Sequence, residues 1–211
     1  MKHIAESTVR RLSLYLSFLE TFESRGLQTI SSDELAQQGG TTSAQVRKDL
    51  SFFGSFGKRG LGYSVPELSE RLRSILGLGR EWKVVIVGAG KIGAALAQYR
   101  GFAQRGFRVV GVYDKNPALV GTKWDEHVVR DVATLEDDVA RERPEIAVLA
   151  VSSEGAQEVV DRLAAAGVRA VLNFAPVPLT VPPGVALKTV NMAMELEGLS
   201  FALTNRDAIE E

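Results

Sequence analysis

Residues 84–93 read Val84-Val85-Ile86-Val87-Gly88-Ala89-Gly90-Lys91-Ile92-Gly93. An apolar, β-branched run that enters Gly-x-Gly-x-x-Gly predicts a strand, a tight turn and a helix. The first glycine lets the chain turn, the second lets backbone amides approach a pyrophosphate, and the third lets the helix pack close to the strand. Unpaired N–H groups at the start of that helix favour a negative charge. The stretch therefore predicts a dinucleotide site at Gly88, Ala89, Gly90, Lys91, Ile92 and Gly93.

A second strand strengthens this prediction. The apolar run 107–113 ends in Asp114, 21 residues after Gly93, where a dinucleotide site requires a carboxylate for the adenosine ribose hydroxyls. A carboxylate in that place accepts NAD(H) and repels the 2′-phosphate of NADP(H). Two alternatives stay open: a glycine turn that binds nothing, and one that binds another nucleotide such as a coenzyme A.

The alternation of elements from Lys83 to Phe174 predicts the fold class. Apolar, strand-like runs alternate with helix-like segments, which is typical of a doubly wound parallel sheet of the Rossmann type, although the third strand, at Val128-Val129, is poorly marked. Ligands of such sheets lie at the carboxyl ends of the strands. Three residues that follow strands are therefore candidates to line the nicotinamide half of the site, with ordinary loop chemistry as the alternative: Ser152, Asn173 and Phe174.

The N-terminal part has the order of a helix-turn-helix. Apolar residues at steps of three and four predict a helix over 8–26, with a buried stripe of Val9, Leu12, Leu16, Leu19 and Phe22. Ser31 and Glu34 form the capping-box pattern of a second, short helix. Thr41 or Thr42 caps a third helix through Phe53, whose buried stripe is Val46, Leu50 and Phe53.

The other side of this third helix predicts contact with DNA. Lys48 and Ser51 lie opposite the apolar stripe and Arg47 lies to one flank, as in a recognition helix. The glycine-rich stretch 54–63 follows, and it predicts a β-hairpin wing with Lys58 and Arg59 at its tip. Residues 1–80 carry 11 Lys+Arg against 8 Asp+Glu, whereas residues 81–211 carry 14 against 18. A winged helix that docks on protein is the alternative.

Composition limits the possible functions. The chain has 211 residues, of which 45% are hydrophobic, and we expect two domains. It has no cysteine, which excludes disulfides and cysteine-based metal sites. The two histidines, His3 and His127, have no companion constellation, so we expect neither catalysis nor a metal. With no run long enough for a membrane helix and no export signal, we expect a cytoplasmic protein that does not use a membrane.

The end of the chain carries an apolar helix pattern that needs a cover. Residues 185–190 predict a further strand, and Met192–Leu203 predicts a helix with the stripe Ala193, Leu196, Leu199 and Leu203. Either its own domain or a second subunit covers this stripe. We therefore divide the chain into a winged-helix DNA-binding domain (1–78), a Rossmann NAD(H)-binding domain (82–190) and a C-terminal dimerisation helix (191–211).

The whole pattern resembles the Rex family of redox-sensing transcriptional repressors, almost from end to end. The resemblance is carried by the segments Val46-Arg47-Lys48-Asp49-Leu50-Ser51, Gly60-Leu61-Gly62-Tyr63, Val87 to Gly93, Leu172-Asn173-Phe174-Ala175-Pro176 and Leu199-Ser200-Phe201-Ala202. It implies a homodimer that exchanges its last helix between subunits and senses the NADH/NAD ratio, so that NADH releases operator DNA. The rival classes are a small NAD-dependent oxidoreductase and a coenzyme A-binding domain with an N-terminal extension.

The chain departs from the family at the residues of the switch. After the fingerprint helix it has Tyr99-Arg100-Gly101-Phe102, where the family commonly has Tyr-Pro-Gly-Phe. The resemblance implies that Tyr99 belongs to the cofactor-binding site and that, when NADH binds, it contacts an arginine on the first helix and an aspartate just before the last helix. These two positions are Ser17 and Asn191 here. The tyrosine is retained and its charged partners are not, which predicts a weaker switch.

Overall fold

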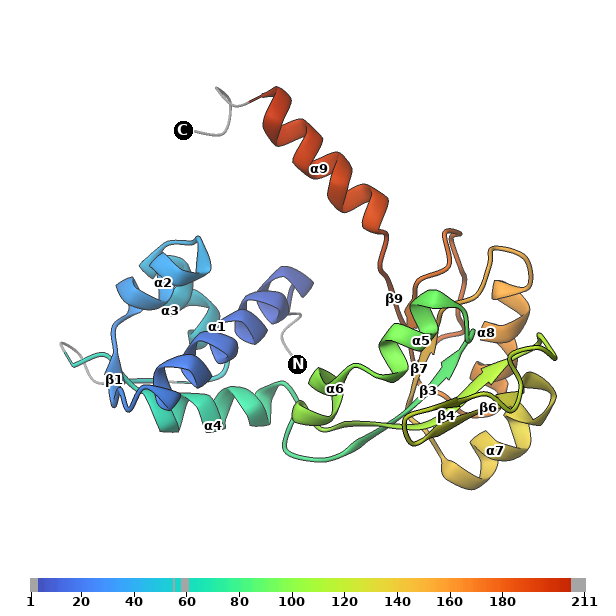
Figure 1. Ribbon diagram of the computed structural model, residues 1–211. Coiled ribbons are helices and arrows are strands. Elements are labelled where there is room, and N and C mark those ends of the chain that lie inside the picture. Colours follow the sequence, from blue (N-terminus) through green and yellow to red (C-terminus); the bar gives the residue numbers. More distant parts are fainter. Residues whose placement is uncertain (1–3, 55, 58–60, 206–211) are drawn as a thin grey trace. The chain divides into compact units, whose positions relative to one another are not determined.

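The computed structural model describes residues 4–54, 56–57 and 61–205. The chain divides into two compact units, Met1–Arg80 and Glu81–Glu211, which are described separately. Figure 1 shows a helical N-terminal unit and a C-terminal unit built on a sheet.

The N-terminal unit contains four helices and one pair of short strands among its described residues: α1 (Glu6–Ser24), β1 (Thr29–Ile30), α2 (Ser32–Gly39), α3 (Ser43–Ser51), β2 (Tyr63–Ser64) and α4 (Val65–Ile75). The core of the unit forms around α1, whose side chains of Leu12, Leu16 and Leu19 are fully buried. The prediction that Val9 belongs to this stripe is wrong, because Val9 is 41% exposed. Tyr15 takes the buried place instead, and a step of three residues from Leu12 puts it on the same face.

The predicted caps of the helix-turn-helix are confirmed. The Ser31 hydroxyl accepts the backbone N–H of Glu34 at 3.1 Å, and the Glu34 carboxylate accepts the backbone N–H of Ser31 at 2.8 Å. Thr42, rather than Thr41, caps α3 through the N–H of Gln45. These bonds satisfy donors that would otherwise be unpaired at the helix starts, so they fix where α2 and α3 begin.

The strand pair of this unit was not expected from the sequence. The pattern predicted a hairpin within 54–63, but Tyr63 pairs with Ile30, which precedes α2. The strand pair thus joins the chain before the helix-turn-helix to the chain after it. Lys58 and Arg59, the predicted tip of the wing, lie outside the described residues.

The C-terminal unit has a seven-stranded sheet in the order β5-β6-β4-β3-β7-β8-β9. All neighbours are parallel except β5 and β6, and the order from β6 to β9 is that of a Rossmann sheet. The predicted fold class is therefore confirmed. The elements are β3 (Trp82–Val87), α5 (Lys91–Ala97), α6 (Arg100–Gln104), β4 (Phe107–Asp114), β5 (Lys123–Trp124), β6 (His127–Asp131), a 3₁₀ turn (Val132–Thr134), α7 (Leu135–Glu142), β7 (Ile146–Leu149), α8 (Ala156–Ala165), β8 (Ala170–Asn173), β9 (Ala186–Thr189) and α9 (Met192–Thr204).

Helices cover both faces of this sheet (Figure 1). Val85 and Val87 of the central strand β3 pack in the cluster that includes α7 and α8, whereas Val84 and Ile86 pack in the cluster that includes α5. Alternate residues of a strand point to opposite faces, so β3 is apolar on both sides and reads as a continuous apolar run. This burial fixes the carboxyl end of β3, where the glycine turn begins.

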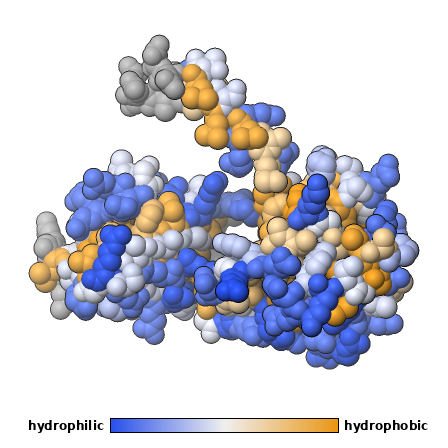
Figure 2. Space-filling view, viewed as in Figure 1, coloured by the Kyte–Doolittle hydropathy of each residue, from blue (hydrophilic) through white to orange (hydrophobic). Residues whose placement is uncertain are grey.

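Helix α9 leaves its apolar side chains in solvent. Six large ones are 58–65% exposed: Met192, Met194, Leu196, Leu199, Phe201 and Leu203. They form the orange band on the helix in Figure 2. Among the described residues, no helix is long and apolar enough to span a membrane. The described residues of its own unit thus do not cover the apolar side chains of this helix.

Candidate nucleotide and DNA sites

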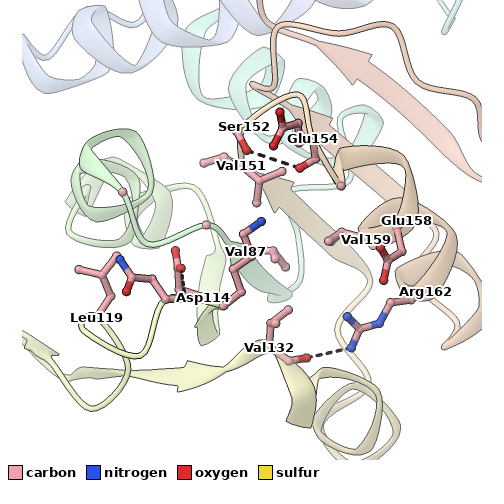
Figure 3. A pocket seen from close by; sticks show the side chains of 16 residues that line it. Val87, Asp114, Leu119, Val132, Val151, Ser152, Glu154, Glu158, Val159 and Arg162 are labelled. Atoms are coloured by element: carbon pink, nitrogen blue, oxygen red, sulfur yellow. Dashed lines mark hydrogen bonds between the residues drawn. The ribbon is translucent and has the colours of Figure 1, made fainter.

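A cavity of about 360 Å³ lies at the carboxyl ends of the central strands (Figure 3). Its volume is in the range of small-molecule sites. The wall comes from the ends of β3 and β4, the loop after β7 and the first turns of α8, and consists of Val87, Gly88, Gly90, Asp114, Lys115, Asn116, Leu119, Val132, Ala150, Val151, Ser152, Glu154, Gly155, Glu158, Val159 and Arg162. Ligands of open parallel sheets bind at this place.

The first and third glycines of the fingerprint have no room for a side chain. Gly88 has a φ of 103°, and a Cβ there would overlap the carbonyl oxygen of Ala150. A Cβ on Gly93 would overlap the carbonyl oxygen of Gly88, so α5 packs directly on the turn. Gly90 faces open space and lines the cavity. This arrangement leaves bare backbone at the point where a pyrophosphate would approach.

Asp114 is held in one orientation by two backbone donors. Its Oδ2 accepts the N–H of Ala89 at 2.6 Å, and its Oδ1 accepts the N–H of Asn116 at 2.8 Å. The first bond ties the end of β4 to the glycine turn. A carboxylate has about four acceptor sites, so both oxygens can still accept a hydroxyl from the ligand. The carboxylate thus has the orientation and the capacity to bind a pair of ribose hydroxyls.

Arg162 of α8 closes the far end of the cavity, as Figure 3 shows. Its Nη2 donates to the carbonyl of Val132 at 2.9 Å and to Glu136 Oε2 at 2.8 Å. The hydrogen bonds from Arg162 hold the pKa of Glu136 below its usual range. The guanidinium is therefore already paired with a carboxylate, and these bonds tie α8 to the 3₁₀ turn and to α7.

The three residues predicted for the nicotinamide half lie in different surroundings. Ser152 is exposed and lines the cavity, and its hydroxyl donates to the carbonyl of Glu154 at 3.4 Å. Asn173 is fully buried; it accepts the N–H of Ala175 at 2.8 Å and donates to the carbonyls of Ala175 and Val177. Phe174 packs in the cluster on the α5 face. Within the described residues, the cavity wall includes neither Asn173 nor Phe174.

The remaining predicted nucleotide residues lie around the start of α5 and beyond it. Ala89 is buried in the turn, and Lys91 and Ile92 are exposed on the first turn of the helix. Tyr99 is 59% exposed, and its ring meets that of Phe102 edge to face, with 5.2 Å between the centroids. The side chains of Lys91, Ile92 and Tyr99 are therefore accessible to a ligand or a partner.

Helix α3 presents its predicted DNA-binding residues outward. Arg47, Lys48 and Ser51 are exposed, and Val46 and Leu50 are buried. The guanidinium of Arg47 donates from Nη1 to the Ser32 hydroxyl at 2.8 Å, which ties α3 to the first turn of α2. Lys48 and Ser51 lie on the outward side of α3, as in a recognition helix, and the Ser51 hydroxyl donates to the backbone carbonyl of Lys48 at 2.7 Å.

One buried polar cluster of the N-terminal unit escaped the sequence analysis. Asp49 of α3 has a side chain with no exposed surface, and the Arg11 fork donates to it from Nε at 2.6 Å and from Nη2 at 2.7 Å. Tyr15, Gln45 and Thr8 donate to it as well, at 3.1, 2.8 and 3.5 Å. A signal was available, because at about 100° per residue Asp49 lies on the flank of the predicted buried stripe, on the side opposite to Arg47.

The electrostatics of this cluster favour the ionised carboxylate. Burial alone would raise the pKa of Asp49, but the hydrogen bonds from Arg11, Gln45 and Tyr15 outweigh it, and the pKa lies below its usual range. Burial and the hydrogen bond to Asp49 raise the pKa of Tyr15 to about 12. Over the described residues, no group of three or more His, Asp and Glu is arranged to hold a metal ion.

Two family models match the chain. The model described as "CoA binding domain" matches residues 79–177, and the model described as "Putative DNA-binding protein N-terminus" matches residues 3–51. The two matches fall in the two units and together include the glycine turn, Asp114 and helix α3.

Curated proteins and solved structures match over nearly the full length. The redox-sensing transcriptional repressor Rex of Carboxydothermus hydrogenoformans is 47% identical over 198 residues, which cover 94% of this chain and 95% of that protein. A crystal structure of RSP, a Rex-family repressor, with NAD⁺ and operator DNA has a TM-score of 0.92 at 38% identity and covers 100% of this chain and 97% of that one. The structure of RSP with NADH has a TM-score of 0.90 at 37% identity and covers 100% and 99%.

Proposed function

The chain belongs to the Rex family of redox-sensing transcriptional repressors, and from this premise we propose which of its residues bind the nucleotide and the operator. It is a DNA-binding repressor that senses NADH against NAD⁺ and releases operator DNA when NADH binds. The nucleotide is a sensed ligand, and the protein is not an enzyme.

The nucleotide site is proposed at the cavity of the C-terminal unit. The observation that carries the proposal is Asp114, held by two backbone N–H groups beside a glycine turn that has room for a pyrophosphate. Asp114 binds the adenosine ribose, and residues 88–93 bind the pyrophosphate. The nicotinamide half of the site consists of Ser152, Asn173, Phe174 and Tyr99. Ser152 contacts the nucleotide, and Asn173 holds the loop 173–177 in place.

The operator site is proposed on α3 and the following wing, with Arg47, Lys48, Ser51, Lys58 and Arg59 as contacts. The exposure of the first three supports this proposal. A second copy of the chain is the partner that covers α9, because a two-fold symmetric protein reads two half-sites of a duplex. The functional domains are then residues 1–78, 82–190 and 191–211, and the protein works in the cytoplasm, where its operator DNA is.

This function is tested by titrating DNA with the protein at a fixed concentration of nucleotide. The probe is the duplex that the protein itself selects from a random pool, with a scrambled duplex of the same length as control. Saturating NADH should weaken binding to the selected duplex, and saturating NAD⁺ should not. Coenzyme A is a third arm, because one family model bears its name. An equal response to NADH and coenzyme A would contradict the assignment of the site to NAD(H).

Asp114 predicts the choice between NAD(H) and NADP(H). A 2′-phosphate would lie next to a carboxylate whose two oxygens are fixed by backbone bonds and cannot turn away. We expect NADPH to bind at least about 10-fold more weakly than NADH, which is about 1.4 kcal/mol. Calorimetry with both nucleotides measures the ratio, and equal affinities would remove this role from Asp114.

The DNA contacts are tested by alanine variants of Arg47, Lys48, Lys58 and Arg59. Each lost phosphate contact should reduce the slope of log affinity against log salt by about one unit, on the selected and the scrambled duplex alike. Arg143, on the other unit, is the matched control. If all four variants keep the affinity and the slope of the native protein, α3 and the wing are not the operator site.

A further inference from the structure

We propose that Asp49, together with Arg11, is a positioning residue for reading the operator sequence. The pair holds helix α3 at one rotation and one height on helix α1, so that the outward side chains of α3 meet base edges. This inference rests on the proposed function of α3. It concerns two residues that do not face the DNA: Asp49 has no exposed surface, and the Arg11 side chain is 25% exposed.

The hydrogen bonds to Asp49 restrict two motions of α3 relative to α1. The Arg11 fork grips both oxygens of the carboxylate, at 2.6 and 2.7 Å, which fixes the plane of the carboxylate relative to α1. Tyr15, one turn further along α1, donates to the Oδ2 atom. Arg11 and Tyr15 of α1 therefore both donate to a single residue in the last turn of α3, and they restrict both the rotation of α3 and its displacement along α1.

Apolar packing alone would hold α3 less firmly. The helix has nine residues, and its buried apolar side chains are Val46 and Leu50. Apolar burial is not directional, so two such side chains leave a helix of this length free to rotate by small angles. Hydrogen bonds weaken steeply away from their preferred geometry, and a functional constellation has to be held within about 0.5 Å and 10–20°. The buried carboxylate supplies this constraint.

Gln45 connects the carboxylate to the surface of α3. Its Nε2 donates to Asp49 Oδ1 at 2.8 Å, from one turn before Asp49 on the same helix. Thr8 completes the surroundings of the carboxylate from α1, with its hydroxyl at 3.5 Å. Arg11, Tyr15, Gln45 and Thr8 thus all donate to the carboxylate, and the Thr8 hydroxyl also accepts from Arg11 Nη2 at 3.2 Å.

Phosphate contacts and base contacts respond differently to a loose helix. A lysine or arginine follows a phosphate over a range of helix positions, because the attraction is long-range and its side chain is flexible. A base edge demands the donor in one place. Loss of the Asp49–Arg11 pair should therefore reduce binding to the selected duplex and leave binding to the scrambled duplex unchanged.

The experiment uses the full-length protein and two variants. Arg11→Lys keeps the positive charge and removes the fork, and Asp49→Asn keeps the shape and removes the negative charge. Arg10→Lys, at the exposed neighbouring position of α1, is the matched control. For each protein, the affinity is measured for the selected and the scrambled duplex at two salt concentrations, and far-UV circular dichroism establishes that the protein is folded at the assay temperature.

We expect both variants to lose about 10-fold or more in affinity for the selected duplex, comparable to the loss of a base contact, with the scrambled duplex and the salt slope unchanged. The control should behave like the native protein. Equal losses on both duplexes, or none on either, in a folded Arg11→Lys protein would overturn the proposal. If the Asp49→Asn protein does not fold, the Arg11→Lys result alone tests the proposal. A native protein without preference for the selected duplex would instead overturn the proposed function.

Discussion

Helices α1 and α9, one in each unit, treat their apolar side chains in opposite ways. Helix α1 alternates buried leucines with exposed polar residues, and Leu12, Leu16 and Leu19 have no exposed surface. Helix α9 is more apolar over its 13 residues, yet none of them is buried. An amphipathic helix such as α1 finds its cover within its own unit, whereas an apolar helix that lies in solvent indicates a partner outside it.

The largest expected effect is the loss of α9. A chain that ends before Met192 should be monomeric, and its affinity for the selected duplex should fall by about 100-fold or more, because one subunit no longer raises the local concentration of the other. Analytical ultracentrifugation and the DNA titration measure the two losses. A full-length protein that is monomeric and well folded at micromolar concentration would show that α1 and α9 do not differ in the way proposed.

Two leucine-to-alanine variants, one in each helix, test whether α1 and α9 are covered in different ways. Leu16→Ala removes a fully buried side chain and should lower the free energy of unfolding of the N-terminal unit by about 2–5 kcal/mol at any protein concentration. Leu199→Ala, on α9, should change stability only at concentrations where the dimer forms.

The two tryptophans allow the unfolding of the C-terminal unit to be followed separately. Trp82 and Trp124 both belong to Glu81–Glu211, so their fluorescence reports the C-terminal unit, and far-UV circular dichroism reports both. Leu16→Ala should shift the circular dichroism transition more than the fluorescence transition. A Leu199→Ala shift that is independent of protein concentration would mean that α9 is covered within its own chain.

Much of the fold could be predicted from the sequence, because short local patterns encode it. The capping box of Ser31 and Glu34, the stripe of Leu12, Leu16 and Leu19, and the glycine turn are each encoded in a few neighbouring residues, and each is confirmed. Val9 was misplaced because spacings of three and four allow more than one stripe on a helix, and only packing selects between them.

Features that depend on distant residues were not predicted. The pairing of Ile30 with Tyr63 involves strands of two residues, which are too short to show a period. The bond of Asp114 to the glycine turn is made by a backbone N–H, which no side-chain pattern reveals. The Asp49 cluster joins α1 and α3 across 38 residues, and its members are ordinary surface residue types.

The buried carboxylate of α3 predicts an acid-sensitive N-terminal unit. The pKa of Asp49 is lower in the folded protein than the value of about 3.9 in an unfolded chain. Its stabilising contribution is therefore complete above about pH 4 and is lost as the pH falls through the folded pKa. Asp49→Asn should flatten this loss of stability, measured as the urea midpoint by circular dichroism between pH 6 and about pH 3. An unchanged slope would mean that other carboxylates dominate the acid response.

Tyr15 predicts a second loss of stability, at alkaline pH instead of acid pH. Its pKa of about 12 lies above the value of about 10 in an unfolded chain, so its contribution is complete below about pH 10 and is lost as the pH rises toward 12. Tyr15→Phe should reduce this loss in the N-terminal unit, where burial also raises the pKa of Tyr63. Tyr113, whose pKa is also about 12, gives the same window in the C-terminal unit, so the tryptophan fluorescence transition should keep its alkaline loss in Tyr15→Phe.

The smallest expected effect concerns the switch, which in the family would link α1 to the start of α9. Ser17 is exposed on α1, and Asn191 caps α9 by accepting the N–H of Ala193 at 3.0 Å. If Tyr99 meets these two positions when NADH binds, as the resemblance implies, it can make only neutral hydrogen bonds there. A charged hydrogen bond contributes about 1.5–3 kcal/mol and a neutral one about half as much, so we expect NADH to shift operator affinity by about 1 kcal/mol.

The double variant Ser17→Arg plus Asn191→Asp tests whether those charges limit the switch. Aspartate caps a helix as well as asparagine does, so Asn191→Asp should keep α9 intact while it adds a charge. Arginine at the exposed position 17 buries nothing by itself. Because an effector shifts an equilibrium only by contacts that differ between the two states, the added charges should raise the ratio of operator affinities in NAD⁺ and NADH from about 5-fold toward about 100-fold. A native protein with a large ratio that the double variant does not raise would mean that the coupling runs through contacts other than Tyr99, Ser17 and Asn191.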